Sequence, residues 1–197
     1  MSRLEKLIVA GIVIFIFLFA RSLMLDTQYQ GFISDPIQLN LPNPEAVSIP
    51  GKDGEIKATL MAEYTIEAVV KGKEKYSDYP SQISSYDFIL AWGELNKKEV
   101  GKYIKYSQSG RWYYYRYFQG LPVSVDYIGN HSANVHIIHK DKEVLNEIKG
   151  IDKGDHVILH GYLVNVSFKD GPWNSSLSRN DTGNGACEIM YVTSVEL

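Results

Sequence analysis

The sequence has a single cysteine and no excess of positive charge. Cys187 is the one cysteine in 197 residues, so no intrachain disulfide can form and the fold depends on its hydrophobic core. Lysine and arginine total 20 against 23 aspartates and glutamates, a formal net charge of −3. Nucleic-acid binding rests largely on the neutralisation of phosphates. The composition therefore argues against a nucleic-acid partner.

A tight cluster of metal ligands is also missing from the sequence. All 5 histidines lie in one third of the chain, but only His156 and His160 would share a face of one strand. Four residues along a strand span about 13 Å, which is too far for two ligands of one ion. We therefore expect neither a metal nor a cofactor.

An uncharged apolar run occupies the N-terminus. It extends from Leu7 to Ala20 and, beyond Arg21, it continues to Leu25. A membrane-spanning helix needs roughly 20 residues, a length that this run reaches if the Arg21 side chain snorkels to the interface. Basic residues precede the run, which places the N-terminus in the cytoplasm. Residues 1–25 are thus predicted to be a cytoplasmic tip and a transmembrane anchor.

A cleaved signal peptide is the alternative interpretation of this segment. The length of the apolar core would suit it, but Leu18-Phe19-Ala20 has a large residue where the cleavage pattern requires a small one. We expect a single-pass protein of the cytoplasmic membrane, with its N-terminus inside and its C-terminal domain outside the cytoplasm.

The remaining sequence predicts a spacer followed by one domain. Residues 26–50 are rich in proline and show little periodicity, which is typical of an extended spacer. In residues 51–197, short apolar runs with alternating faces favour a mainly β domain with minor helices, and we expect a small OB-like antiparallel barrel. The expected strands cover 55–71 with a bend or bulge near Ala62, 112–118, 123–128, 134–138, 156–166 and 188–196; the expected helices cover 96–106 and 142–149; and 86–93 is a buried strand or a helical turn.

Cys187 is the candidate catalytic residue. A cysteine nucleophile needs a base that removes its proton, and it gains from positive charge nearby. His131 and His136 are the candidate bases, and Arg179 is the candidate orienting or oxyanion-stabilising group. In the alternative interpretation, Cys187 is a small core residue at the start of the last strand and His136 is a hydrogen-bonded buried side chain.

The run from Trp112 to Phe118 is almost entirely aromatic and has high strand propensity. An exposed aromatic face would stack on sugar rings, and the negative net charge favours a glycan over a nucleic-acid base. A protein interface, or a strand with tyrosines on both faces, is the alternative. The candidate binding residues are Trp112, Tyr114, Trp173 and Asp181.

Several stretches resemble a family of uncharacterised bacterial proteins that are exported and anchored in the membrane. This resemblance implies export and supplies no mechanism. Three short pieces, 129–131, 154–155 and 181–187, are also similar to motifs of sortases, which are cysteine transpeptidases; here, however, Asn130 separates the glycine from the histidine, and no arginine follows Cys187. The stretches shared with the exported family are 86–93 with its Asp-x-x-x-x-Trp-Gly motif, 131–138, 154–155, 161–164, and 175–188 with its Asp-Thr-Gly-x-Gly-Ala-Cys-Glu motif.

Together these patterns favour a membrane-anchored extracytoplasmic interaction or accessory module of the cell envelope, with a protein partner there. The alternative is a cysteine hydrolase or a sortase-like transpeptidase with Cys187 as its nucleophile.

Overall fold

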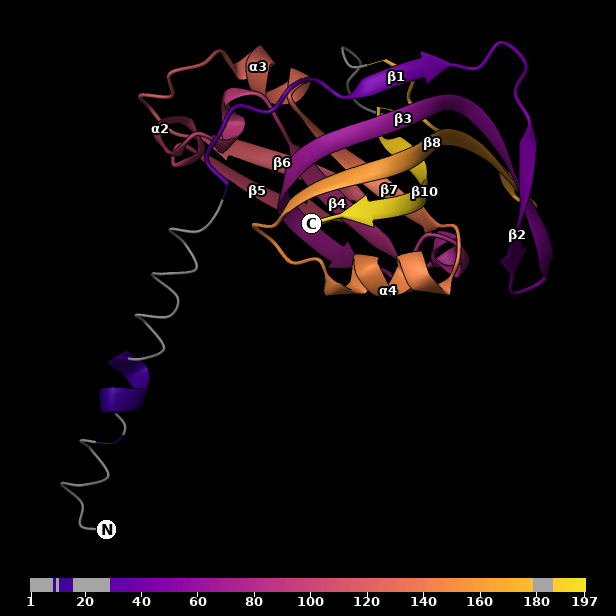
Figure 1. The fold of residues 1–197 in the computed structure, drawn as a ribbon, viewed down its shortest axis with the longest axis horizontal. Helices are drawn as coiled ribbons and strands as arrows, with labels where there is room; N and C mark the ends of the chain where they lie inside the picture. The colour runs from indigo at the N-terminus through magenta and orange to yellow at the C-terminus, as the bar shows by residue number, and fades with distance from the viewer. Residues whose placement is uncertain (1–8, 10, 16–28, 179–185) are drawn as a thin grey trace.

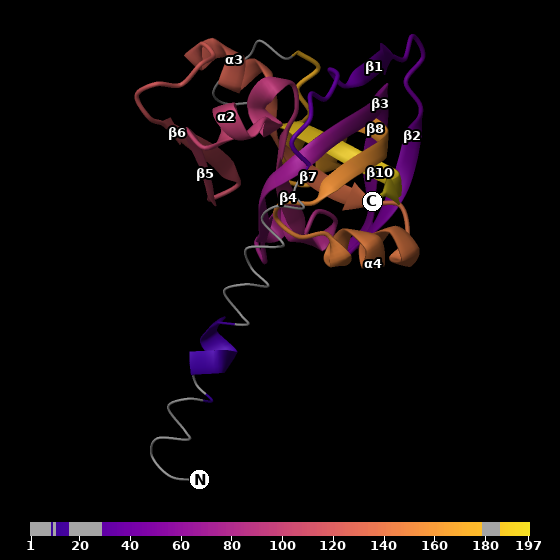
Figure 2. The same ribbon diagram turned by 60° about the vertical axis from the view of Figure 1, so that its left-hand side comes forward.

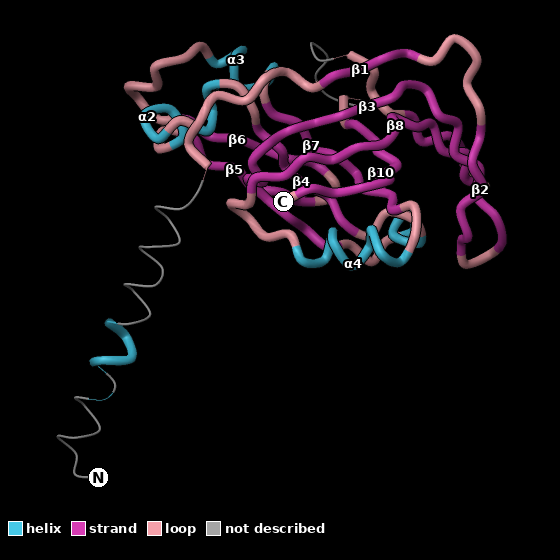
Figure 3. Tube along the Cα trace, in the orientation of Figure 1, coloured by secondary structure: helices cyan, strands magenta, loops and turns pink. Residues whose placement is uncertain are grey.

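The structure, a computed structural model, describes residues 9, 11–15, 29–178 and 186–197. Within these residues the protein is mainly β, as expected (Figure 3). The strands are β1 (Ile37–Asn40), β2 (Ala46–Gly51), β3 (Gly54–Lys75), β4 (Tyr86–Ala91), β5 (Ile104–Ser109), β6 (Trp112–Tyr117), β7 (Ser132–His139), β8 (His156–Phe168), β9 (Gly171–Asn174) and β10 (Glu188–Glu196). The helices are η1 (Tyr79–Gln82), η2 (Glu94–Asn96), α2 (Lys98–Gly101), α3 (Val125–Asn130) and α4 (Lys142–Gly150).

The main sheet closes into a ring. Its strands follow the order β3, β4, β7, β10 and β8, and β8 pairs again with β3. The β7–β10 pairing is parallel, whereas the other pairings around the ring are antiparallel. Strands β1 and β2 extend the sheet beside β3 (Figure 1). Strand β9 extends it beside β8. A separate hairpin, β5–β6, lies with α2 and α3 at one end of the ring (Figure 2).

Strand β3 bends because it carries a bulge. Its alternate residues Ala62, Tyr64 and Ile66 are buried in the core that the ring encloses, whereas Ala58, before the bulge, belongs to a second buried cluster. The register of β3 against β8 shifts between Leu60 and Ala62. This irregularity confirms the predicted bulge near Ala62, and a bulge increases local twist, which helps a long strand to curve around a closed sheet.

Helix α4 packs against the core of the ring. Its apolar side chains Val144 and Ile148 are buried in that core. Asp141 caps its N-terminus by accepting hydrogen bonds from the backbone amides of Glu143 and Val144. At the other end, the Lys73 ammonium donates to a carbonyl of the last turn, where a positive charge also suits the helix dipole. The predicted helix over 142–149 is confirmed.

Two local predictions were wrong. The stretch expected to be a strand over 123–128 forms α3, because Ser124 accepts a hydrogen bond from the amide of Tyr127 and thereby starts a helix. The helix expected over 96–106 is limited to the single turn of α2, and β5 begins at Ile104. Gly101 lowers helix propensity at that point, and the following residues form a strand that pairs with β6 instead of continuing the helix.

The segment predicted as an extended spacer contributes to the sheet. Strands β1 and β2, which lie within residues 26–50 apart from Gly51, both pair with β3, and Ile33 is buried in the core. Prolines are compatible with this arrangement because they stand beside β1 and within β2 at the edges of the sheet.

The predicted anchor, residues 1–25, lies largely outside the described residues. Val9 and residues 11–15 are helical, and their apolar side chains are exposed. Among the residues that the structure describes, no helix is both long enough and apolar enough to cross a membrane.

Candidate functional site

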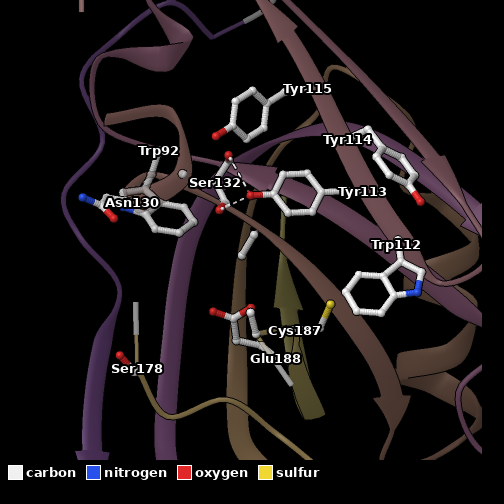
Figure 4. Close-up of a pocket in the computed structure, with 13 residues that line it drawn as sticks. Trp92, Trp112, Tyr113, Tyr114, Tyr115, Asn130, Ser132, Ser178, Cys187 and Glu188 are labelled. Atoms are coloured by element: carbon white, nitrogen blue, oxygen red, sulfur yellow. Dashed lines mark hydrogen bonds between the residues drawn. The ribbon is translucent and has the colours of Figure 1, made fainter. Parts of the chain in front are cut away.

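A cavity of about 370 Å³ lies between the β5–β6 hairpin, the end of α3 and the start of β10. Figure 4 shows aromatic rings around it, with Cys187 and Glu188 together on one side. Its volume falls within the range of small-molecule sites. The lining residues are Trp92, Trp112, Tyr113, Tyr114, Tyr115, Gly129, Asn130, Ser132, Ala133, Ser178, Ala186, Cys187 and Glu188.

The alternation of strand β6 distributes its aromatic side chains over two faces. Trp112 and Tyr114 are 38% and 54% exposed, and both line the cavity. Tyr113 and Tyr115 are half-buried on the other face, where they pack against each other with ring centroids 6.1 Å apart. The sequence-predicted binding residues Trp112 and Tyr114 are thus brought together at one site.

Tyr113 ties the hairpin to strand β7. Its hydroxyl donates a 3.0 Å hydrogen bond to the carbonyl oxygen of Ser132. Burial raises the pKa of Tyr113 to about 12. The hydroxyl therefore remains protonated at neutral pH and serves as a fixed donor in the cavity wall.

Trp92 forms the opposite wall and is held in place by polar contacts. Its Nε1 donates a 2.9 Å hydrogen bond to Asp35 Oδ1. The next residue, Gly93, has φ 61°, and a Cβ there would lie 2.5 Å from the Tyr127 hydroxyl. Only glycine suits this position, because a side chain would be strained by the backbone and would also collide with Tyr127.

The candidate base His131 is engaged with neighbours other than Cys187. Its ring stacks on Tyr127 with centroids 3.7 Å apart, and its Nδ1 lies 2.9 Å from the carbonyl oxygen of the same residue. Its Nε2 is 3.7 Å from Asp35 Oδ1. His131 therefore supports the Trp92 wall of the cavity.

The second candidate base, His136, is buried against an acid. Its Nδ1 lies 2.9 Å from Asp87 Oδ2, and its ring packs on Trp173 with centroids 4.7 Å apart. In the parallel register of β10 with β7, it stands opposite Ile189, two residues beyond Cys187. Two residues along a strand correspond to roughly 7 Å. The described contacts of His136 therefore involve Asp87 and Trp173.

Cys187 is half-buried, and its side chain lines the cavity. Asn134 Nδ2 lies 4.0 Å from its Sγ atom and 3.0 Å from the carbonyl oxygen of Arg111. The Asn134 Oδ1 atom accepts a hydrogen bond from Gln108. Asn134 thus connects the hairpin to the cysteine side of the cavity.

The hairpin is fixed by Arg111, a residue that sequence reasoning missed. Arg111 has φ 72° in the two-residue turn between β5 and β6, a conformation that favours hairpin closure. Its guanidinium is 2.7 Å from buried Asp87 and 2.6 Å from Asp78, and it donates to the carbonyl oxygen of Ser84. A Gly-Arg pair before an aromatic strand is a signal for a turn, but spacing along the chain does not indicate which acids pair with the arginine.

Of the remaining predicted site residues, Arg179 and Asp181 lie outside the described residues. Trp173 belongs to β9 and contacts His136 and Phe168, away from the cavity lining. Over the described ranges, no group of three histidine, cysteine, aspartate or glutamate side chains is placed to hold a metal ion.

Comparisons of the chain with protein-family models, with curated proteins and with solved structures found no match. The geometry of the site therefore carries the functional argument.

Proposed function

We propose that the protein is an anchored extracytoplasmic binding module with an OB-like barrel, and that the aromatic cavity is its ligand site. The single observation that carries the proposal is the cavity of about 370 Å³ with five aromatic side chains in its wall. Sites of this kind provide apolar contact area together with a few polar groups that fix orientation.

The OB-like assignment is supported by the order of the ring. In chain order, the five ring strands are β3, β4, β7, β8 and β10. Around the ring they pair in the order β3, β4, β7, β10, β8 and then β3 again, so the fifth strand lies between the third and the fourth. In OB-folds, the face of the second and third strands and the adjoining loops bind oligonucleotides and oligosaccharides. The cavity adjoins β4 through Trp92, β7 through Ser132 and the loop before β10 through Ser178.

A glycan is the ligand class that suits this cavity best. The exposed rings of Trp112 and Tyr114 can stack on sugar faces, and the side chains of Asn130, Ser132 and Glu188 can hydrogen-bond to hydroxyl groups. The net charge of −3 disfavours an oligonucleotide. A glycan is also consistent with a position at the cell envelope, where the proposed anchor and a protein partner would hold the module.

The test is a pull-down of the full chain, solubilised in mild detergent, on purified cell-wall glycan and on chitin. Trp112→Ala and Tyr114→Ala should each reduce binding by roughly 5- to 150-fold, because stacking on an aromatic side chain contributes about 1–3 kcal/mol. Tyr117→Ala is the matched control, since Tyr117 is exposed on the same strand but does not line the cavity. Equal binding by all four proteins, or none by the wild type, would reject the glycan assignment.

A protein partner is tested separately by gentle solubilisation of native membranes. The module should then co-purify with an envelope protein, and substitution of Trp112 should weaken that association if the cavity takes part in it. A chain that remains a monomer in native membranes contradicts the accessory role.

A cysteine hydrolase is the second candidate, and the position of Cys187 in the cavity wall favours it. Catalysis would require a base beside the sulfur, whereas the described contacts of His131 and His136 are with other residues. Thiol labelling across pH separates the two functions. A thiolate that titrates well below pH 8 supports catalysis, and an unreactive native thiol supports the binding module.

A further inference from the structure

A second hollow, distinct from the aromatic cavity, lies between β3, β5 and the loop that follows α4. It has a volume of about 320 Å³, and three of its seven lining residues are lysines: Lys71, Lys105 and Lys153. No acidic side chain lines it. An adjoining hollow of about 350 Å³ shares Lys71, Lys153 and Tyr106 with the first, so the two form one continuous depression.

Lys71 is half-buried, lines both parts of this depression and has no acidic partner within ion-pair distance among the described residues. Lys73, two residues further along the same strand, differs from Lys71 in that its charge is compensated. Its ammonium donates hydrogen bonds to the carbonyl oxygens of Lys149 and Ile151. A buried charge without such compensation is expensive, and proteins rarely keep one without a reason.

The electrostatic surroundings of Lys71 are dominated by positive charge. Burial and the neighbouring Lys153 ammonium lower the pKa of Lys71 to about 8. The ionisable groups that line the depression with it are Lys105 and Tyr106 from β5, Asp152 and Lys153 from the loop after α4, and Lys73 and Glu74 from its own strand. Lys71 is thus a desolvated cation beside a second cation, and the approach of an anion would favour its charged form.

We propose that this depression binds a small oxyanion of the phosphate or sulfate class between Lys71 and Lys153. Lys105 stands at the rim, where its ammonium lies 5.4 Å from the centroid of the Phe118 ring. The lysines act as strong donors and point charges toward the oxyanion. The oxyanion is either a free ion or group of a soluble ligand, or the headgroup of an anionic lipid, since both present the same chemistry.

The experiment uses the full chain in dodecyl maltoside micelles, and it compares the wild type with Lys71→Met, Lys153→Gln and the control Lys57→Gln. Lys57 is an exposed lysine of the same strand that does not line the depression. One arm adds inorganic sulfate against sodium chloride at equal ionic strength. The other arm dopes the micelles with phosphatidylglycerol against phosphatidylcholine. The readout in both is the shift in Tm.

Sulfate also stabilises compact states non-specifically. We therefore expect the anion to raise the Tm of the wild type and of Lys57→Gln by several degrees more than the Tm of Lys71→Met and Lys153→Gln. A shift with sulfate identifies a free oxyanion, and a shift with phosphatidylglycerol alone identifies a lipid headgroup. Without any anion, Lys71→Met should be at least as stable as the wild type, because the uncompensated cation has been removed.

A pH series with sulfate adds a readout that a merely structural lysine would not move. Sulfate keeps its charge between pH 7 and pH 9, whereas Lys71, with a pKa of about 8, loses its proton in this range. The affinity should therefore fall about tenfold. No Tm shift of the wild type in either arm, or a shift of the same size in Lys71→Met or Lys153→Gln, would overturn the proposal.

Discussion

Asp87 is the residue on which the polar part of the interior depends. Its carboxylate is completely buried, with one oxygen 2.7 Å from Arg111 Nη1 and the other 2.9 Å from His136 Nδ1. A buried carboxylate is tolerated only when it is paired. Asp87 therefore requires the hairpin tip that carries Arg111, and this requirement links the interior of the ring to the wall of the aromatic cavity.

Asp78, the second acid on Arg111, gives a pH-dependent contribution to stability. The hydrogen bonds from Arg111 lower the pKa of Asp78 from its ordinary value of 3.8 to about 2. A lowered folded-state pKa stabilises the protein above the unfolded value, and this contribution is lost as the pH falls toward 2. Because the side chain is 41% exposed, solvent screening reduces the contribution to about 0.5–1 kcal/mol.

Asp78→Asn should therefore lower the free energy of unfolding at pH 7 by about 0.5–1 kcal/mol. The difference from the wild type should shrink as the pH is lowered below 4, since the wild-type carboxyl is then protonated in the unfolded chain. Urea unfolding at pH 7, 4 and 2.5 measures this difference in the free energy of unfolding. Asp53→Asn, at an exposed turn position, is the control, and a pH-independent loss for Asp78→Asn would contradict the interpretation.

At the scale of elements, the β5–β6 hairpin is a unit that docks onto the ring through its tip. Arg111 donates hydrogen bonds to the carboxylates of Asp78 and Asp87. Asn134 of β7 accepts a hydrogen bond from Gln108 and donates one to the carbonyl oxygen of Arg111. The docking fixes Trp112 and Tyr114 at the cavity, so the shape of the site depends on a charge pair outside it.

Arg111→Ala should destabilise the protein by about 3–5 kcal/mol, because it leaves the Asp87 carboxylate buried without its arginine. Arg111→Ala combined with Asp87→Asn should recover part of the loss. Arg116→Ala, at an exposed position of the same hairpin, should change stability by less than about 0.5 kcal/mol. Urea unfolding gives the three values, and equal losses for Arg111→Ala and Arg116→Ala would refute the docking role.

Strand β8 shows a different constraint, since it passes very close to β10 at Gly161. A Cβ on Gly161 would lie 2.0 Å from the carbonyl oxygen of Tyr191, a backbone atom that cannot turn away. The close approach of the two backbones is the reason that no side chain fits at this glycine.

Gly161→Ala should therefore lower the free energy of unfolding by about 3 kcal/mol or more. Gly150→Ala is the control, because a Cβ at Gly150, the last residue of α4, would meet no atom within 4 Å. Chemical unfolding of the two variants measures the contrast. A Gly161→Ala protein as stable as the wild type would show that β8 and β10 separate easily at this point.

At the scale of the whole molecule, the chain before the ring is both a part of the sheet and the connection to the predicted anchor. Ile33 is buried in the core, and Tyr29 stacks on His156 with centroids 4.2 Å apart. If residues 1–25 form the predicted anchor, only a few residues separate it from the first part of the chain that packs on the folded domain.

The full chain should remain in the membrane pellet after extraction with alkaline carbonate, because a helix of about 20 apolar residues resists that treatment. A chain that starts at Asp26 should appear in the soluble fraction with unchanged circular dichroism, since Tyr29 and Ile33 are retained. Release of the full chain by carbonate would argue against the anchor.

Part of this architecture was predictable from the sequence. The alternation of Glu55 to Lys71 predicted β3, the irregularity at Ala62 predicted its bulge, and the spacing of apolar residues predicted α4. These features depend on neighbours in sequence, and each is confirmed. The prediction of a strand over 123–128 was wrong because the cap at Ser124 prevails over β propensity, and that competition is settled by hydrogen bonds within the fold.

The candidate site was predictable only in pieces. The aromatic run indicated Trp112 and Tyr114 as binding residues, and the lone Cys187 was the candidate nucleophile. All three line one cavity. The partners of the histidines were not predictable, because Asp87 and His136 are brought together by the β4–β7 register and not by spacing along the chain.

The sequence by itself determined the composition, the strand-forming periodicity, the absence of disulfides and the location of the aromatic residues. Only the tertiary structure decided that β8 closes the ring on β3, that Arg111 is paired with two acids, and that Lys71 and Lys153 line one depression. The physical reason is that periodicity sets which face of an element is apolar, whereas the partner of a side chain is chosen by long-range pairing. Charge pairs, cavities and uncompensated cations are properties of that pairing.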